Sequence, residues 1–287
     1  MRKEVRQAMR ICSEAVRRAV ERRVADGLCE ELRFRIGRSV LASVGGKSVS
    51  LEVQTTRAML DELLERATQQ SAYAAQEMLR CGFVTLPGGH RLGICGTAVL
   101  REGKTRTLRG ISSMNLRIAR ELPGIGEACA GWLWTHPASA LLFGPPASGK
   151  TTLLRDLIRL IAQRQRVCVV DERQELAACL DGVPQFDLGE NTDVISAVPK
   201  ELGITLLLRS MNPQWIAVDE ITAAEDVQAI VRASYCGVRF LATAHAASRQ
   251  ELFSRPVYRS LMEQGVFRNL ISVSPDHSVR IERGNVG

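Results

Sequence analysis

The chain has 287 residues, 45% of them apolar, which is enough for two domains that each bury a core. No apolar stretch approaches the ~18 residues that a membrane-spanning helix needs, and no apolar region follows the first residues, so we expect neither a membrane span nor secretion. The formal net charge is +7, with 22 Lys+Arg against 14 Asp+Glu up to His136 and 16 against 17 after it.

The first half of the sequence predicts a small α+β domain over residues 1–134, with a boundary near Trp134. Helical spacing of apolar residues is expected over residues 5–24, 56–67, 72–79 and 129–134, and strands over 32–36, 50–54, 82–86, 90–100 and 110–118. Hairpin turns are expected at Gly45-Gly46 and at Pro87-Gly88-Gly89. The first helix carries arginines opposite small apolar residues, which favours packing against its own domain over binding to a membrane surface.

From His136 onward, short apolar strands alternate with helices. This order predicts a second domain over residues 135–287 with a mostly parallel sheet and helices on both faces, of the RecA-like P-loop type. The expected strands are 140–143, 167–170, 215–218 and 240–243, with two closing strands between 266 and 281, and the expected helices are 153–161, 203–208 and 223–234. RecA-like sites are commonly completed by a neighbouring subunit.

A phosphate-binding loop of the pattern G-x-x-x-x-G-K-[ST] lies between the first strand and helix of this domain. The residues predicted to bind the nucleotide are Gly144, Pro145, Pro146, Ala147, Ser148, Gly149, Lys150, Thr151 and Thr152. Glycines allow successive backbone N–H groups to curl around phosphates at a helix N-terminus. Lys150 is expected to reach the β and γ phosphates, and the Thr151 hydroxyl to bind Mg²⁺. The sequence therefore predicts a site for ATP or GTP with Mg²⁺.

Two acids, Asp219 and Glu220, follow the apolar strand 215–218, as in a Walker B motif. Ligands of such sheets bind at the carboxyl ends of the strands. Asp219 is expected to hold Mg²⁺ through water, and Glu220 to act as the general base for the attacking water. These two residues predict hydrolysis in addition to binding.

Two further strand ends carry polar side chains. His245 follows strand 240–243, where the imidazole or the Thr243 hydroxyl could contact the γ-phosphate; the alternative is an ordinary loop histidine. Asp171, Glu172 and Glu175 follow strand 167–170. We expect a catalytic role for at least one of these acids, the alternative being a solvated helix start.

The eight cysteines occur singly and without metal-site spacing, which favours a reducing cytosol. The basic first half is compatible with an anionic partner, such as lipid, nucleic acid or an acidic protein, and equally with a solvated arginine-rich surface.

The chain resembles the stage III sporulation protein AA family in motifs spread over nearly its whole length. These are Gly-Pro-Pro-x-Ser-Gly-Lys-Thr-Thr, Val-Val-Asp-Glu-Arg, Leu-Leu-Arg-Ser-Met-x-Pro, Val-Asp-Glu-Ile and Thr-x-His-Ala, with Gly-Gly-His-Arg-Leu-Gly upstream. That family is similar to the hexameric motor ATPases of type II and type IV secretion and of type IV pili. The resemblance implies a cytoplasmic ATP hydrolase that forms a homo-oligomeric, hexameric ring. It would be peripheral at the forespore membrane, on the mother-cell side, and serve a channel-like complex during endospore formation.

The resemblance also implies roles for individual residues. It aligns the segment 171–175, including Glu172, with an acidic box of the secretion motors, and His245 with their histidine box. Arginines in family-like motifs are candidates to complete a neighbouring subunit's nucleotide site, with plain surface arginine as the alternative: Arg91, Arg117 and Arg120. Arg209 is a further candidate for a subunit contact or sensor. Secretion motors usually carry Gly-Glu where this chain has Asp219-Glu220, so the metal and base roles here resemble those of ordinary P-loop ATPases.

Three functions are compatible with these features. The first is a motor ATPase on a membrane-associated secretion or channel complex. The second is a nucleic-acid-stimulated RecA-like ATPase, and the third is a nucleotide-gated scaffold without turnover. The intact acidic pair favours hydrolysis. The basic half offers few aromatic residues for base stacking, so we do not expect nucleic acid as a partner.

Overall fold

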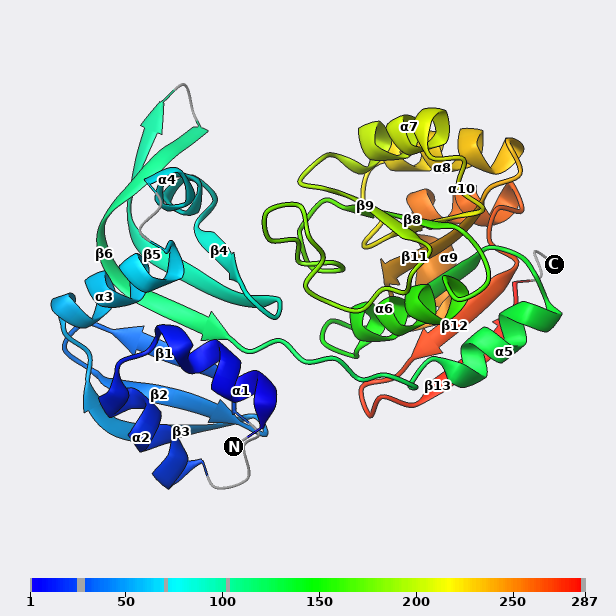
Figure 1. Ribbon diagram of the computed structural model, residues 1–287. Coiled ribbons are helices and arrows are strands. Elements are labelled where there is room, and N and C mark those ends of the chain that lie inside the picture. Colours follow the sequence, from blue (N-terminus) through cyan, green and yellow to red (C-terminus); the bar gives the residue numbers. More distant parts are fainter. Residues whose placement is uncertain (1, 25–28, 70–71, 102–103, 285–287) are drawn as a thin grey trace. The chain divides into compact units, whose positions relative to one another are not determined.

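The computed structural model describes residues 2–24, 29–69, 72–101 and 104–284 and divides into two compact units, Met1–Arg120 and Glu121–Gly287 (Figure 1). The predicted boundary near Trp134 is too late. Helix α5 (Glu127–Thr135) buries Cys129, Ala130 and Leu133 in the same core as helix α6, so it belongs to the second unit.

The first unit is a six-stranded antiparallel sheet with helices. Its strands are β1 (Cys29–Arg35), β2 (Ser39–Val44), β3 (Lys47–Gln54), β4 (Phe83–Leu86), β5 (His90–Arg101) and β6 (Lys104–Arg117), in the spatial order β3-β2-β1-β6-β5-β4. Its helices are α1 (Lys3–Ala8), the 3₁₀ turn η1 (Met9–Ile11), α2 (Glu14–Arg23), α3 (Arg57–Ala67) and α4 (Ala72–Cys81). The α+β prediction for this half is confirmed.

Alternation along the strands gives this sheet one buried face. Leu32 and Phe34 on β1 are fully buried and belong to one core with apolar residues of the helices, whereas Arg33 and Arg35 between and after them are exposed. Because successive strand residues point to opposite faces, the arginines lie on the face away from the core.

Two details of the first unit differ from prediction. The expected helix over residues 5–24 is interrupted, because Cys12 and Ser13 are extended (ψ 153° and 157°), although its apolar positions are buried as expected. Strand β2 was not predicted. It precedes the predicted turn at Gly45-Gly46, where both glycines adopt positive φ (54° and 76°) and so suit the tight β2–β3 connection.

The second unit is a seven-stranded, mostly parallel sheet with helices on both faces, which confirms the predicted fold class. Its strands are β7 (Ala140–Gly144), β8 (Val167–Asp171), β9 (Thr192–Ser196), β10 (Trp215–Val218), β11 (Arg239–His245), β12 (Asn269–Val273) and β13 (Val279–Arg283). Their order is β13-β12-β7-β11-β10-β8-β9, and only β13 is antiparallel to its neighbour. Strand β9 has no counterpart among the predicted elements.

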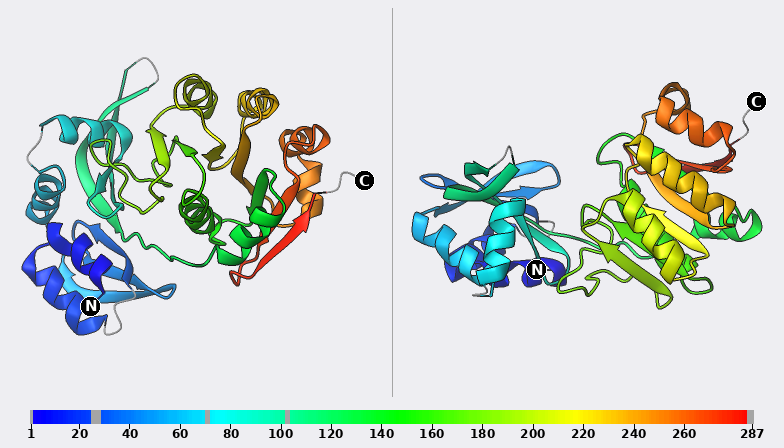
Figure 2. Two further views of the ribbon diagram at one scale, coloured as in Figure 1. Left: turned by 45° about the vertical axis from the view of Figure 1, so that its right-hand side comes forward. Right: turned by 90° about the horizontal axis from the view of Figure 1, so that it is seen from above.

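The helices of the second unit are α5, α6 (Lys150–Ile161), α7 (Lys200–Ser210), α8 (Ala224–Tyr235), α9 (Arg249–Ser254) and α10 (Pro256–Glu263), the last two not predicted. Leu141 and Phe143 of β7 pack with α7, α8 and α10, whereas Ala140 and Leu142 pack with α5 and α6. These two groups of helices lie on opposite faces of the sheet (Figures 1 and 2). Among the residues described, no helix has both the length and the apolar character needed to cross a membrane.

Candidate nucleotide-binding site

The phosphate-binding loop connects the carboxyl end of β7 to the first turn of α6, as predicted. A Cβ atom at Gly144 would lie 2.2 Å from the Val273 carbonyl oxygen and 2.8 Å from Ser148 Oγ, so only glycine fits. Gly149 has φ 97°, a conformation that a side chain would strain. These two glycines allow the loop to turn tightly before the N-terminus of α6, the geometry in which backbone N–H groups bind phosphate.

The Lys150 side chain is buried, with 5% of the residue exposed. Its Nζ donates to the carbonyl oxygens of Gly144 (3.0 Å) and Pro145 (2.7 Å), so the ammonium is held along the loop. Burial lowers the pKa of Lys150, and the carboxylates of Asp219 and Glu220 oppose that shift.

Asp219 lies directly after β10 and accepts hydrogen bonds on both carboxylate oxygens. Thr151 Oγ1 donates to Oδ2 at 2.9 Å, and Thr243 Oγ1 of β11 donates to Oδ1. Burial raises the pKa of Asp219, and the two hydroxyls oppose that shift. The structure thus brings the two predicted metal ligands, Thr151 and Asp219, within hydrogen-bonding distance, an oxygen donor set that suits Mg²⁺.

No group of three or more His, Cys, Asp or Glu residues that could hold a metal occurs in the described part of the chain. Mg²⁺ typically keeps several waters and binds through one or two protein oxygens and the phosphates of its nucleotide. Thr151 and Asp219 fit that mode.

Glu220 is held at its backbone and at both carboxylate oxygens. Its φ is 51°, and its N–H donates to Thr243 Oγ1 at 2.8 Å. His245 Nε2 lies 2.6 Å from Oε1, and an Arg173 guanidinium nitrogen pairs with Oε2. Since a carboxylate oxygen accepts, Nε2 of His245 carries the proton. Thr243, one of the two residues predicted as a possible contact of the γ-phosphate, joins Asp219 to Glu220.

Asp171, at the end of β8, organises the segment that follows it. Its carboxylate accepts four backbone N–H groups, those of Glu175 (2.8 Å), Leu176 (3.0 Å), Ala177 (2.8 Å) and Ala178 (3.2 Å). A buried carboxylate with four donors has its charge stabilised in place. Asp171 therefore fixes the backbone from which its neighbours project.

Glu172, predicted to be catalytic, pairs with Lys200 at the start of α7. Lys200 is only 4% exposed, and its Nζ also lies 3.9 Å from Asp226 of α8. The predicted acidic segment therefore divides: Asp171 supports the backbone, Glu172 neutralises a buried lysine, and Arg173 is the side chain that reaches Glu220.

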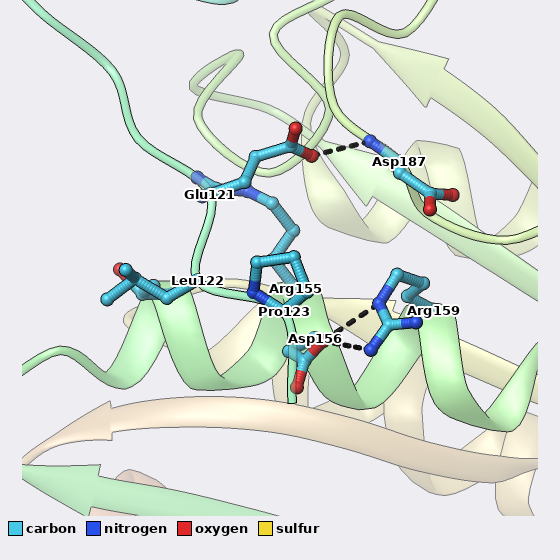
Figure 3. Close-up of a pocket in the computed structure, with 8 residues that line it drawn as sticks. Glu121, Leu122, Pro123, Arg155, Asp156, Arg159 and Asp187 are labelled. Atoms are coloured by element: carbon cyan, nitrogen blue, oxygen red, sulfur yellow. Dashed lines mark hydrogen bonds and ion pairs between the residues drawn. The ribbon is translucent and has the colours of Figure 1, made fainter. Parts of the chain in front are cut away.

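A cavity of about 110 Å³ lies beside Thr152, the last residue of the phosphate-binding loop. It is lined by Glu121, Leu122, Pro123, Thr152, Arg155, Asp156, Arg159 and Asp187. Glu121 Oε1 accepts a hydrogen bond from the Asp187 N–H at 2.7 Å. Arg159 donates from Nε (2.8 Å) and Nη2 (2.6 Å) to Asp156 Oδ1 (Figure 3). Charged groups of both signs thus surround a space next to the loop.

His277 contacts the loop from the turn between β12 and β13. Its Nδ1 donates to the Ser148 carbonyl oxygen at 2.9 Å. The sequence placed a turn here but gave no sign of this contact, because the two residues lie 129 positions apart.

The predicted arginines of the first unit lie on or beside its sheet. Arg91 on β5 is directly opposite Arg117 on β6, and its guanidinium stands 4.2 Å from the centre of the Phe83 ring. Arg120 donates to the Cys29 carbonyl oxygen at 3.0 Å. Arg209, in the last turn of α7 of the second unit, is exposed.

The strand order and the loop together define a RecA-like P-loop fold, in which β11 separates the loop strand β7 from the acidic strand β10. The family model described as "Sporulation stage III, protein AA" matches residues 2–282, and the chain belongs to this family. It is 38% identical over 252 residues to stage III sporulation protein AA of Bacillus subtilis (strain 168), covering 85% of this chain and 82% of that protein. This similarity confirms the predicted family and supports an ATPase-like role in sporulation.

Solved secretion and pilus motors share the fold. The ATPase DotB of Legionella pneumophila is 18% identical, with a TM-score of 0.59, over 93% of this chain and 78% of that one. The pilus retraction motor PilT, solved with bound ADP, is 17% identical, with a TM-score of 0.61, over 88% of this chain and 76% of that one.

Proposed function

We propose that this chain is a Mg²⁺-dependent ATPase that works as a homo-oligomeric ring and energises a membrane-associated channel complex during sporulation. The observation that carries the proposal is the 2.9 Å hydrogen bond between Thr151 and Asp219 beside the buried Lys150. It joins the loop of β7 to the acid of β10, two strands apart in the sheet, at the place where a triphosphate and its metal would lie.

Each residue of the site then has a defined task. The loop N–H groups and Lys150 would bind the phosphates, and Asp219 with Thr151 would hold Mg²⁺, whose chemistry would be to neutralise negative charge on the triphosphate. Glu220 orients a water and accepts its proton as the water oxygen attacks the γ-phosphorus and the bond to the β–γ bridging oxygen breaks, giving ADP and phosphate. His245 fixes the Glu220 carboxylate from the other side.

The nucleoside would extend from the loop towards the cavity beside Thr152. The cavity supports this direction because it adjoins the last residue of the loop, and the carboxylates of Glu121 and Asp187 offer acceptors for an exocyclic amine such as that of adenine. Arg155 contributes a cation in the same space, its guanidinium stacked 3.8 Å from the Phe186 ring centre.

Assembly into a ring would supply the remaining positive charge. Arg91 and Arg117 sit opposite each other on neighbouring strands, and with Arg120 they are the residues that we propose complete a neighbouring subunit's site. A cation opposite the γ-phosphate stabilises the transition state of phosphoryl transfer, and such an arginine is worth about 10³–10⁵ in rate. We propose Arg209 as a further contact between subunits. We also propose that the protein lies in the cytoplasm, at the periphery of the membrane.

The test is the Mg²⁺-ATPase rate per subunit as a function of protein concentration, with mass followed by light scattering. We expect the rate to rise with assembly, Lys150→Ala to abolish it, and the exposed-lysine control Lys47→Ala to leave it unchanged. Glu220→Gln should bind ATP without turnover. Full activity in Glu220→Gln would contradict its role as base, and ATP binding without turnover in the wild type would favour the nucleotide-gated scaffold.

Mixed oligomers test the shared site. Lys150→Ala and Arg117→Ala are each expected to be inactive alone. If one subunit supplies the loop and its neighbour the arginine, mixing the two variants restores part of the activity; no recovery at any ratio would place Arg117 outside the site.

A further inference from the structure

We infer that Arg173 is a positioning residue that restrains the Glu220 carboxylate, and that the Arg173–Glu220 ion pair competes with the attacking water for this carboxylate. The inference rests on the proposed function, in which Glu220 is the base. It starts from a contact that no motif of the phosphate-binding loop or the acidic pair requires: Arg173 Nη1 pairs with Glu220 Oε2 across 47 positions of sequence.

Both ends of this ion pair stand on fixed backbone. Strands β8 and β10 are parallel neighbours in register, with Val170 opposite Val218, so the segments that follow them lie side by side. The segment after β8 is held by the four N–H groups that Asp171 accepts. The backbone of Glu220 is held by Thr243. Only side-chain rotation of Arg173 or Glu220 can therefore separate the pair.

Each oxygen of the Glu220 carboxylate already has one donor in this arrangement. Oε1 faces His245 Nε2 at 2.6 Å and Oε2 faces the Arg173 guanidinium, while only 16% of the Glu220 side chain is exposed. A general base has to lie within hydrogen-bonding reach of the proton that it takes. A water at either oxygen would share it with His245 or Arg173, so these two side chains compete with the water for the carboxylate.

Arg173 is the partner that can leave. Its side chain is 55% exposed, against 34% for His245, whose ring is anchored at the end of β11 with Nδ1 buried. An exposed guanidinium on a long side chain exchanges a carboxylate for water at little cost. Exposed ion pairs alter an equilibrium by at most about fivefold, so Arg173 restrains Glu220 without locking it.

The experiment combines a readout that needs no nucleotide with a binding cycle. With ¹⁵N-labelled histidine the four imidazoles of the chain are observable, and His245→Gln identifies the signals of His245. Affinities for ATPγS and ADP, each with Mg²⁺, are measured by competition with a fluorescent nucleotide. The variants are Arg173→Gln, Arg173→Lys, Glu220→Gln and the double variant, with Arg232→Gln, an exposed arginine of α8, as the matched charge control.

We expect Arg173→Gln to move the His245 signals, because Glu220 loses its second partner, and Arg173→Lys and Arg232→Gln to leave them near the wild-type positions. Arg173→Gln and Glu220→Gln should each raise the preference for ATPγS over ADP by about two- to fivefold, and the double variant by no more than either single one. The kcat of Arg173→Gln should equal or exceed that of the wild type, with Arg173→Lys restoring wild-type behaviour.

Three outcomes would overturn the inference. The first is that the His245 signals do not move in Arg173→Gln, and the second is that the two substitutions have additive effects in the double variant. The third is weaker ATPγS binding with a reduced kcat in Arg173→Gln, because that result would make Arg173 a direct ligand of the nucleotide. Failure of the proposed function looks different. In that case the wild type binds no nucleotide, or binds it as well as Lys150→Ala does, and the His245 signals alone decide whether Arg173 restrains Glu220.

Discussion

Acidification from pH 6.5 to pH 4 should destabilise the first unit by about 3 kcal/mol through His90 alone. His90 begins β5, is 1% exposed, and accepts a hydrogen bond at Nδ1 from the Ala119 N–H at 3.1 Å. Its neutral ring therefore carries the proton on Nε2. Protonating Nδ1 would bury a positive charge. It would also place two donors, the Nδ1–H of His90 and the backbone N–H of Ala119, opposite each other.

The size of the effect follows from the pKa. Burial lowers the pKa of His90 from 6.5 to about 4, with Glu4 opposing weakly. One pKa unit corresponds to about 1.36 kcal/mol, which gives the estimate of about 3 kcal/mol. Because the folded pKa is the lower one, the unfolded chain takes up the proton first as pH falls. The stabilising contribution is therefore complete above pH 6.5, declines between 6.5 and 4, and is lost below that window.

The free energy of unfolding has to be read from the first unit separately, because the chain has two units that need not unfold together. The free energy of unfolding of the first unit can be measured by hydrogen exchange of backbone amides in β5 and β6, such as those of Leu92 and Leu116. The exchange is followed at increasing urea concentrations, at several pH values between 4 and 7. The comparison is with His90→Asn, whose side-chain oxygen can still accept from Ala119 but does not titrate. We expect the His90→Asn variant to have a lower free energy of unfolding than the wild type at pH 7. The difference between the two proteins should shrink by about 3 kcal/mol when the pH is lowered to 4. Parallel curves for the two proteins across that window would refute the reasoning.

Three substitutions in the second unit have distinct expected outcomes. Asp171→Ala should cost about 3 kcal/mol and lower Tm by roughly 6–12 °C in calorimetry, because four backbone donors lose a charged acceptor; an unchanged Tm would contradict this. Thr243→Val should reduce kcat at least about tenfold while Thr243→Ser retains it, because only the hydroxyl joins Asp219 to Glu220; equal rates for both would exclude that link. Glu172→Gln should stay within about twofold of the wild-type kcat if Glu172 serves Lys200, whereas a loss of about 10²-fold or more would restore its predicted catalytic role.

The features predicted best are those fixed by local backbone chemistry. Gly144 and Gly149 are required by a close approach and a positive φ, so the loop motif carries its own geometry. The meeting of Thr151 and Asp219 also follows from the sequence, because parallel strands place their carboxyl ends at one edge of the sheet.

Contacts between side chains from distant segments could not be predicted in the same way. Asp171, Glu172 and Glu175 look alike in the sequence, and only the tertiary fold gives Asp171 four backbone donors and Glu172 a buried lysine. Nothing local to Arg173 in the sequence indicates that its side chain pairs with Glu220. The break at Cys12 and Ser13 was hidden for a related reason: the apolar spacing is satisfied by two short helices as well as by one long helix.

The pair Asp219-Glu220 is held by β11, the strand that lies between the loop strand β7 and the acidic strand β10. Thr243 on β11 is fully buried, donates to the Asp219 carboxylate and accepts from the Glu220 N–H. A carboxylate at position 219 thereby receives two hydroxyl donors, one from the loop helix and one from β11. The same strand ends at His245, which holds Glu220. Through Thr243 and His245, the single strand β11 thus contacts both Asp219, the proposed metal ligand, and Glu220, the proposed base, so a shift of β11 would move these side chains together.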